Sequence, residues 1–230
     1  MSVKNKKIII GSGFIAKKFN KYYRYLKKSK LVIYAAGISN SSEENKKNLA
    51  KEVNRILNFC KFNDKRIIYI STYSISDTSR LSKKYVKNKI KIEKIVKTLS
   101  ERYLIIRLPE ITGHSKNYKT LTNYFYEKIL HDKLFILFKN TKRNVLDIDD
   151  AIKNCIKVIK LFSKKNATIN LLNKQFYSPI KIVKSFEEIL NKKYFYKEKK
   201  IKNVRWRLSN NFYFKTDKKY LNKILKKYYT

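Results

Sequence analysis

The chain has 230 residues, 43% of them hydrophobic, which is enough for one large domain or two small ones around a buried core. No apolar run approaches the roughly 18 residues that cross a bilayer, and no signal peptide stands out, so we expect a cytoplasmic protein without a membrane span. The net charge of +39 comes mostly from lysines spread along the whole chain. Proteins that recognise a specific nucleic-acid sequence rely on arginine, so we expect no specific nucleic-acid partner. The charge would still attract an anionic substrate.

A glycine-rich turn follows the first predicted strand, residues 6–10. It reads Gly11-Ser12-Gly13-Phe14-Ile15-Ala16, and a predicted helix follows. In such a turn the first glycine allows the tight bend, the second lets backbone approach a pyrophosphate, and a small sixth residue lets the helix pack on the strand. The alternative is an ordinary strand–helix connection. Two of the four glycines in the chain stand in this turn. We therefore favour dinucleotide binding by Gly11, Ser12, Gly13, Phe14 and Ile15.

The next segments alternate between strand and helix patterns. Strands are expected at 31–36, 66–70 and 103–108, a helix at 42–62, and another helix around residues 85–89. This alternation predicts a mostly parallel α/β sheet. The first of these strands ends in Ala35-Ala36-Gly37, where small residues leave room for a ligand across the sheet.

Tyr85 and Lys89 lie four residues apart, and so on one face of their predicted helix, after the strand end that carries Thr72. A nearby ammonium favours the phenolate, which suits proton exchange during a hydride transfer. Taken alone the spacing is weak, because the chain has 18 tyrosines and 56 basic residues. Four other pairs share it: Tyr23/Lys27, Tyr124/Lys128, Tyr177/Lys181 and Tyr196/Lys200.

Beyond Pro109 the pattern is less regular. Helices are expected at 120–131, 149–162, 180–191 and 217–228, and strands at 134–138, 145–148 and 168–172, with an irregular basic stretch before the last helix. Cys60 and Cys155 are expected to be buried thiols rather than a disulfide. With two cysteines and two histidines in the chain, we expect no metal site.

Taken in order, these motifs resemble the extended short-chain dehydrogenase/reductase family, especially its nucleotide-sugar epimerases, dehydratases and reductases. The residues that carry the resemblance are the glycine-rich turn, Val32 to Gly37, Ile70 to Asp77, the Tyr85/Lys89 pair, Arg107-Leu108-Pro109 and Arg143 to Asp150. The resemblance implies a shortened Rossmann-like fold. Its nucleotide-binding core would comprise residues 1–108 and 141–172, and a small substrate-binding part residues 109–140 and 173–230.

The same resemblance implies roles for individual residues. Thr72 would orient the substrate oxygen, Tyr85 would be the general acid/base, and Lys89 would bind the nicotinamide ribose and lower the pKa of the tyrosine. Ala35, Ala36 and Gly37 would line the site of an NAD or NADP cofactor. Arg143 would hold the phosphates of a nucleotide-sugar substrate, a role that suits its forked guanidinium.

Three departures from the family pattern stand out. Too few residues separate the first helix from Leu31 for the family's second and third strands, and the acid that normally meets the adenosine ribose is not evident. Arg24, Lys27, Lys28 and Lys30 would meet a 2′-phosphate or form a solvated basic face. The 13-residue spacing from Thr72 to Tyr85 is short, and Tyr73-Ser74 replaces the Asp-Glu pair that a 4,6-dehydratase needs.

We therefore expect an NAD(P)-dependent oxidoreductase that acts on a nucleotide-activated sugar, most simply a keto-sugar reductase for surface polysaccharide synthesis. A nucleotide-sugar epimerase and a non-catalytic nucleotide- or partner-binding Rossmann protein remain as alternatives. A homodimer is the assembly that such folds suggest.

Overall fold

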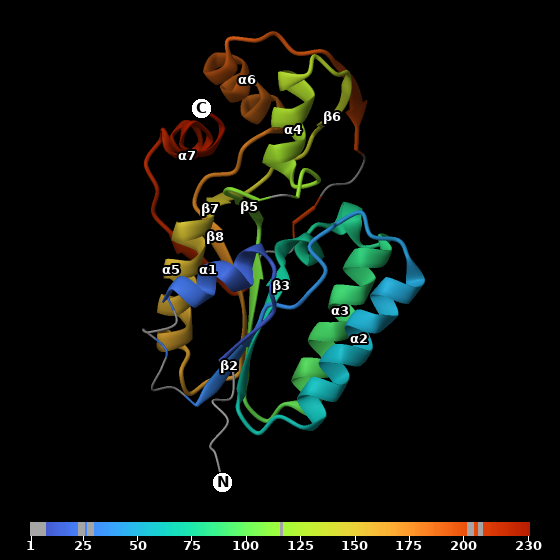
Figure 1. Cartoon of the computed structure of the whole chain (residues 1–230), viewed down its shortest axis with the longest axis vertical. Coiled ribbons are helices and arrows are strands. Elements are labelled where there is room, and N and C mark those ends of the chain that lie inside the picture. Colours follow the sequence, from blue (N-terminus) through green and yellow to red (C-terminus); the bar gives the residue numbers. More distant parts are fainter. Residues whose placement is uncertain (1–7, 23–25, 27–29, 116, 202–204, 207–208) are drawn as a thin grey trace.

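In the computed structural model, residues 8–22, 26, 30–115, 117–201, 205–206 and 209–230 are described. Their main feature is a six-stranded sheet in the order β1-β2-β3-β4-β8-β10, in which every pairing is parallel (Figure 1). The strands are β1 (Ile9–Ile10), β2 (Leu31–Tyr34), β3 (Arg66–Thr72), β4 (Tyr103–Leu108), β8 (Ala167–Asn173) and β10 (Asn211–Phe214). The predicted Rossmann-like α/β class is confirmed.

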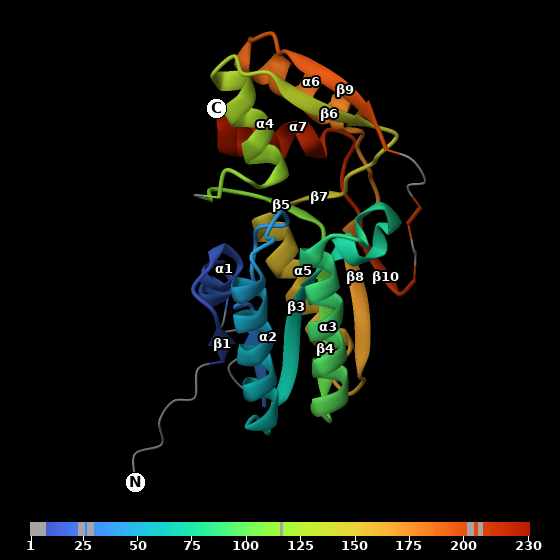
Figure 2. The ribbon, with the colours of Figure 1, turned by 90° about the vertical axis from the view of Figure 1, so that its right-hand side faces the viewer.

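Helices cover both faces of this sheet, as Figures 1 and 2 show. On one face, α1 (Phe14–Tyr22) and α5 (Ile148–Leu161) bury Phe19, Ile152 and other side chains against the sheet. On the other face, α2 (Lys46–Lys61) and α3 (Lys84–Leu99) bury Ile56 and Ile92 with their neighbours. Because both faces are buried, β3 and β4 consist of nearly continuous β-branched and aliphatic residues.

A smaller layer lies beyond the carboxyl ends of the central strands (Figure 2). It contains α4 (Leu121–Leu130), α6 (Pro179–Leu190), α7 (Tyr220–Tyr229) and a two-stranded parallel sheet of β6 (Phe135–Lys139) and β9 (Tyr196–Lys200). Its own cluster of buried residues is rich in aromatic rings. The short sheet of β5 (Glu110–Thr112) and β7 (Val145–Asp147) lies between this layer and the main sheet.

The shortening expected from the sequence is seen in the strand order. Within the described residues β1 pairs with β2 alone, so it forms the edge of the sheet, with no strand beyond it. Lysine-rich β9 and short β5 and β10 were not predicted. β10 extends the main sheet beside β8, although its residues were assigned to the substrate-binding part. That division of the chain stays a prediction.

The remaining predictions about the chain have simple outcomes. Cys60 and Cys155 are buried free thiols, as expected. Among the described helices, none combines the length and apolarity that crossing a membrane requires. Arg24, Lys27 and Lys28, which were considered for a 2′-phosphate, lie outside the described residues, as does the start of the predicted strand at residues 6–7.

Candidate active site

The glycine-rich turn has the shape that a close approach of backbone requires. Gly11 has φ +132°, and a Cβ there would lie 2.6 Å from the Ala35 carbonyl oxygen, so the turn packs directly on the end of β2. A Cβ at Gly13 would meet no atom within 4 Å. Ala16 is completely buried, as the pattern predicted. The turn therefore leaves open space beside Gly13 at the start of α1, where a helix N-terminus favours an anion.

The end of β2 connects this turn to the predicted catalytic residues. Ala35 donates its backbone N–H to the Ile10 carbonyl oxygen at 2.8 Å. Two residues later, a Cβ on Gly37 would lie 2.7 Å from the Lys89 Nζ. The structure thus brings Gly11, Ala35, Gly37 and Lys89 into one continuous set of contacts, although they come from three separate segments.

Thr72 and Tyr85 meet as the sequence predicted. Thr72 is the last residue of β3 and the cap of the short 3-10 helix η2 (Tyr73–Ser76), and its hydroxyl accepts the Ser74 backbone N–H at 3.1 Å. Tyr85, in the first turn of α3, is buried and lies near the Thr72 side chain. Burial raises the pKa of the Tyr85 phenol, an effect that the Thr72 side chain only partly opposes.

Lys89 lies one helical turn after Tyr85, with its Nζ 5.3 Å from the centre of the tyrosine ring. Its Nζ also lies 2.5 Å from the Glu52 Oε1, and both side chains are 3% exposed. The resemblance implied that Lys89 would lower the pKa of Tyr85, but here the pKa is raised. The physical reason is that the phenol is buried and the ammonium is already neutralised by a carboxylate.

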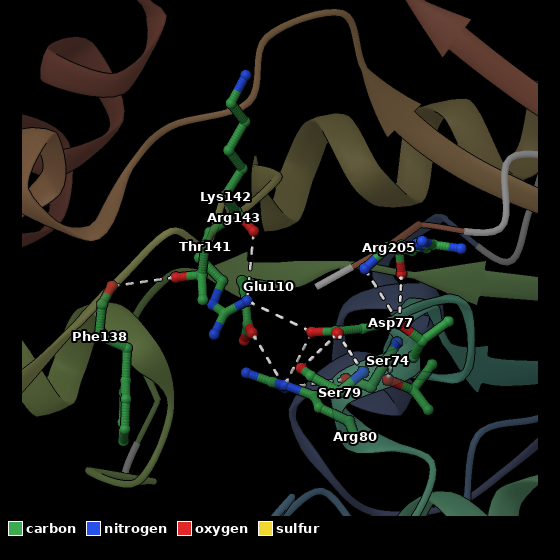
Figure 3. A network of polar contacts seen from close by, with 12 residues as sticks. Ser74, Asp77, Ser79, Arg80, Glu110, Phe138, Thr141, Lys142, Arg143 and Arg205 are labelled. Carbon is green, nitrogen blue, oxygen red and sulfur yellow. Dashed lines mark hydrogen bonds and ion pairs between the residues drawn. The ribbon is translucent and has the colours of Figure 1, made fainter. Parts of the chain in front are cut away.

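Arg143, the predicted phosphate-binding residue, is buried and lies in a polar network with Asp77, Arg80 and Glu110 (Figure 3). Its Nη1 is 3.6 Å from Oδ2 of the fully buried Asp77, and burial lowers its pKa to about 10. Arg80 contacts the same carboxylate and lies 3.8 Å from Glu110. Arg80 and Glu110 also act on the pKa of Tyr85, so the network lies near the tyrosine that the sequence predicts to be catalytic. The Nε of Arg143 has no hydrogen-bond partner among the described residues.

A segment from the C-terminal part of the chain covers one side of this network. Trp206 forms a bridge with Asp77, and its ring stacks on Tyr73 with the centres 4.9 Å apart and an interplanar angle of 9°. The Arg205 carbonyl oxygen accepts the Thr78 backbone N–H at 3.0 Å. The loop that follows Thr72 is thus held by residues more than a hundred positions later.

Sequence reasoning missed Glu52, Asp77, Arg80, Glu110 and Trp206. A signal existed for Glu52, because it lies on the same face of α2 as the buried Leu49, Val53 and Ile56. A carboxylate on an apolar helix face indicates a buried partner. No comparable pattern marks the other four, since tertiary contacts bring them together.

No protein-family model matches the chain. No curated protein sequence matches it either. Solved structures do match. MoeE5 in complex with UDP-glucuronic acid and NAD has a TM-score of 0.70 at 10% identity, over 95% of this chain and 92% of that one. UDP-glucuronic acid 4-epimerase from Bacillus cereus in complex with NAD has a TM-score of 0.60 at 20% identity, over 90% of this chain and 75% of that one.

A reductase is similar to the same extent. The dTDP-4-dehydrorhamnose reductase from Bacillus anthracis in complex with NADP has a TM-score of 0.62 at 15% identity, over 92% of this chain and 80% of that one. The three proteins share a fold across nearly the whole of this chain, with little sequence in common. The chain therefore has the Rossmann-like fold seen in NAD- and NADP-binding nucleotide-sugar epimerases and reductases.

Proposed function

We propose that the protein is an NAD(P)-dependent oxidoreductase that reduces a keto group on the sugar of a nucleotide-activated sugar. The observation that carries the proposal is that Thr72, Tyr85 and Lys89 lie together, with Lys89 packed against Gly37 in the turn after β2. The similar solved structures support it, because they include proteins that bind NAD or NADP and proteins named for their action on sugar nucleotides.

The residues present fit a dinucleotide at the turn and at the catalytic end. The open space at Gly13 and the start of α1 would hold the pyrophosphate, with Ser12, Phe14 and Ile15 flanking it. Ala35, Ala36 and Gly37 would lie along the cofactor, and Lys89 would meet the ribose next to the nicotinamide. The reduced nicotinamide would supply the hydride.

Tyr85 and Thr72 would act on the oxygen of the sugar carbonyl. The two hydroxyl groups lie near each other, so one oxygen atom of a ligand could receive hydrogen bonds from both. An ordinary phenol is already protonated at neutral pH, and burial raises the pKa of Tyr85 further, so its phenol carries a proton. A protonated phenol suits reduction, in which Tyr85 donates its proton as negative charge develops on the oxygen.

Arg143 is our candidate for the phosphates of the sugar nucleotide. Its guanidinium is buried beside Asp77, and among the described residues its Nε has no hydrogen-bond partner, so one donor remains for a ligand. Epimerisation is the second candidate, because an epimerase is among the similar structures. The role in surface polysaccharide synthesis, the cytoplasmic location and a homodimer stay predictions.

The first test is a titration of the purified protein with NADH and NADPH. We expect saturable binding of at least one of them, and the preferred one identifies the cofactor. Binding of neither would point to the non-catalytic alternative. With dTDP-4-dehydrorhamnose and UDP-glucuronic acid as probes, a reductase consumes the reduced cofactor in proportion to product, whereas an epimerase shows no net consumption.

Tyr85→Phe tests the catalytic assignment. It removes the proton donor but keeps the ring, so we expect turnover to fall by at least about a hundredfold while cofactor affinity is preserved. Tyr124→Phe is the matched control. Tyr124 has the same spacing to a lysine on α4, and Lys128 Nζ lies 5.8 Å from its ring centre. Wild-type turnover in Tyr85→Phe would refute the assignment.

A further inference from the structure

Glu52 is a buried carboxylate whose partners include Lys89 of the candidate active site. Its Oε1 accepts hydrogen bonds from Lys89 Nζ at 2.5 Å and from the Ile38 backbone N–H at 3.0 Å. Its Oε2 accepts a hydrogen bond from Asn88 Nδ2 at 2.8 Å. Buried glutamates are rare unless paired. One side chain from α2 thus connects α3 with the turn after β2.

Gly37 makes this arrangement possible. A Cβ at that position would lie 2.7 Å from Lys89 Nζ and 2.9 Å from Glu52 Oε1. The ion pair therefore packs directly against the Gly37 backbone, and its ammonium lies between this turn and the ring of Tyr85. The ammonium has little freedom to move while Glu52 holds it.

The charged and titratable groups around Lys89 come from several elements. Glu52 lies on α2, Tyr85 and Glu93 on α3, and the buried Tyr69 on β3. Glu93 is already occupied, because Arg107 on β4 donates to both of its oxygens, at 2.9 and 2.7 Å. Burial lowers the pKa of Lys89, and Glu52 is the strongest group that opposes this effect.

We propose that Glu52 is a positioning residue that keeps Lys89 protonated and fixed beside Gly37, ready to donate hydrogen bonds to a bound dinucleotide. The hydrogen bonds from Lys89 to a dinucleotide, which are the cofactor part of the proposal, rest on the proposed function. The protonation of Lys89, which is the charge part, concerns the protein alone. Without Glu52, the buried ammonium would have no unpaired carboxylate beside it among the described residues, and it would lose its proton nearer neutral pH.

The charge part is tested without any cofactor. In Glu52→Gln the amide keeps the length of the side chain and can still accept the Ile38 N–H. We expect the ionisation midpoint of Lys89, followed by NMR of its Cε carbon, to fall by about two pH units or more. Lys89→Met identifies the signal. Glu52→Asp keeps the charge and should retain most of the wild-type midpoint.

Glu43→Gln is the matched control for loss of a negative charge. Glu43 and Glu52 line the same hollow of about 200 Å3, but Glu43 hydrogen-bonds to Asn45 and Asn48 rather than to Lys89. We expect no change in the Lys89 midpoint. An unchanged midpoint in Glu52→Gln would overturn the proposal, as would an equal fall in Glu43→Gln. If Glu52→Gln does not fold, the Glu52→Asp midpoint decides, and a fall of about two units there contradicts the proposal.

The cofactor part is tested by the affinity for NADH and NADPH at different pH values. Between about pH 6 and about pH 9 the wild-type affinity should stay level, whereas that of Glu52→Gln should fall by about tenfold as Lys89 becomes neutral. A purely structural role would lower affinity equally at every pH. If the wild type binds neither dinucleotide, the proposed function fails, but the NMR result still decides the role of Glu52.

Discussion

Gly11 and Gly13 stand in the same turn but are needed for different physical reasons. Gly11 has a backbone conformation that side chains rarely adopt, and a Cβ there would collide with the Ala35 carbonyl oxygen at 2.6 Å. Gly13 has neither constraint, because a Cβ would find nothing within 4 Å. The first glycine thus serves the fold, and the second leaves space for a ligand.

The two glycines therefore separate stability from binding. We expect Gly11→Ala to lower the free energy of unfolding by about 1–3 kcal/mol, because it combines backbone strain with a collision. Gly13→Ala should change it by less than about 0.5 kcal/mol but weaken NADH or NADPH binding by about tenfold, since the methyl group would fill the space that we propose for the pyrophosphate. Urea unfolding and cofactor titration measure both. Normal binding by Gly13→Ala would contradict this reading of the turn.

Individual residues differ in how far the sequence predicts them. The glycine spacing and the Tyr85/Lys89 pair follow from local geometry, so the sequence brings them to the correct elements. The pKa of Tyr85 cannot be predicted from local geometry, because it depends on burial and on Glu52, which comes from another helix. Arg143 was predicted as a phosphate ligand, but its contact with Asp77 required two distant loops to meet.

Asp147 joins two helices that are far apart in the sequence. It is the N-cap of α5, where its side chain accepts the backbone N–H groups of Asp149 and Asp150. The same carboxylate accepts hydrogen bonds from Tyr228 at 2.9 Å and from Lys227 at 2.8 Å, both on α7. The Asp147 side chain therefore caps α5, which packs on the main sheet, and holds the C-terminal helix α7 against the start of α5.

Asp147→Ala should accordingly cost about 2 kcal/mol of unfolding free energy, from the lost cap and the lost contacts to α7. Asp217→Ala is the control, because Asp217 also accepts a backbone N–H and a lysine but lies exposed on the surface. Its effect should stay within about 0.5 kcal/mol. Equal losses in the two variants, measured by urea unfolding, would show that Asp147 has no special role.

The strands that the sequence did not predict form because they pair with another strand. β9 reads Tyr-Lys-Glu-Lys-Lys, which has no apolar alternation, and it forms because it pairs with β6, where Phe135 stands opposite Tyr196. β10 follows Asn210, which has φ 53°, and completes the sheet beside β8. Long amphipathic helices and buried strands were predictable because their patterns are local.

On the scale of the whole molecule, several tyrosines lie in the core. Tyr34 and Tyr73 are almost fully buried, and their hydroxyl groups have no hydrogen-bond partner among the described residues. Burial raises the pKa of each to about 12, and it does the same for Tyr177, Tyr228 and Tyr229. The folded chain thus keeps protons that the unfolded chain would lose near pH 10.

The raised tyrosine pKa values predict that the fold loses stability as the pH rises above about 10. These raised pKa values stabilise the fold fully below about pH 10, and the stabilisation is lost as the pH rises toward about 12, by up to about 1.4 kcal/mol per pH unit for each tyrosine. We expect the urea midpoint to fall steeply between these limits. Tyrosinate absorbance and circular dichroism should change together. Ionisation of the buried tyrosines with the helices intact would contradict the prediction.

The position of Trp206 has an optical consequence. It is the only tryptophan in the chain, and it stacks on Tyr73 in the loop after Thr72. All indole fluorescence therefore originates beside the loop that follows Thr72, at the rim of the candidate active site. A reduced nicotinamide absorbs light of the wavelengths that indole emits, so its arrival would quench this emission. The protein thus contains its own fluorescent reporter, placed beside the loop that follows Thr72.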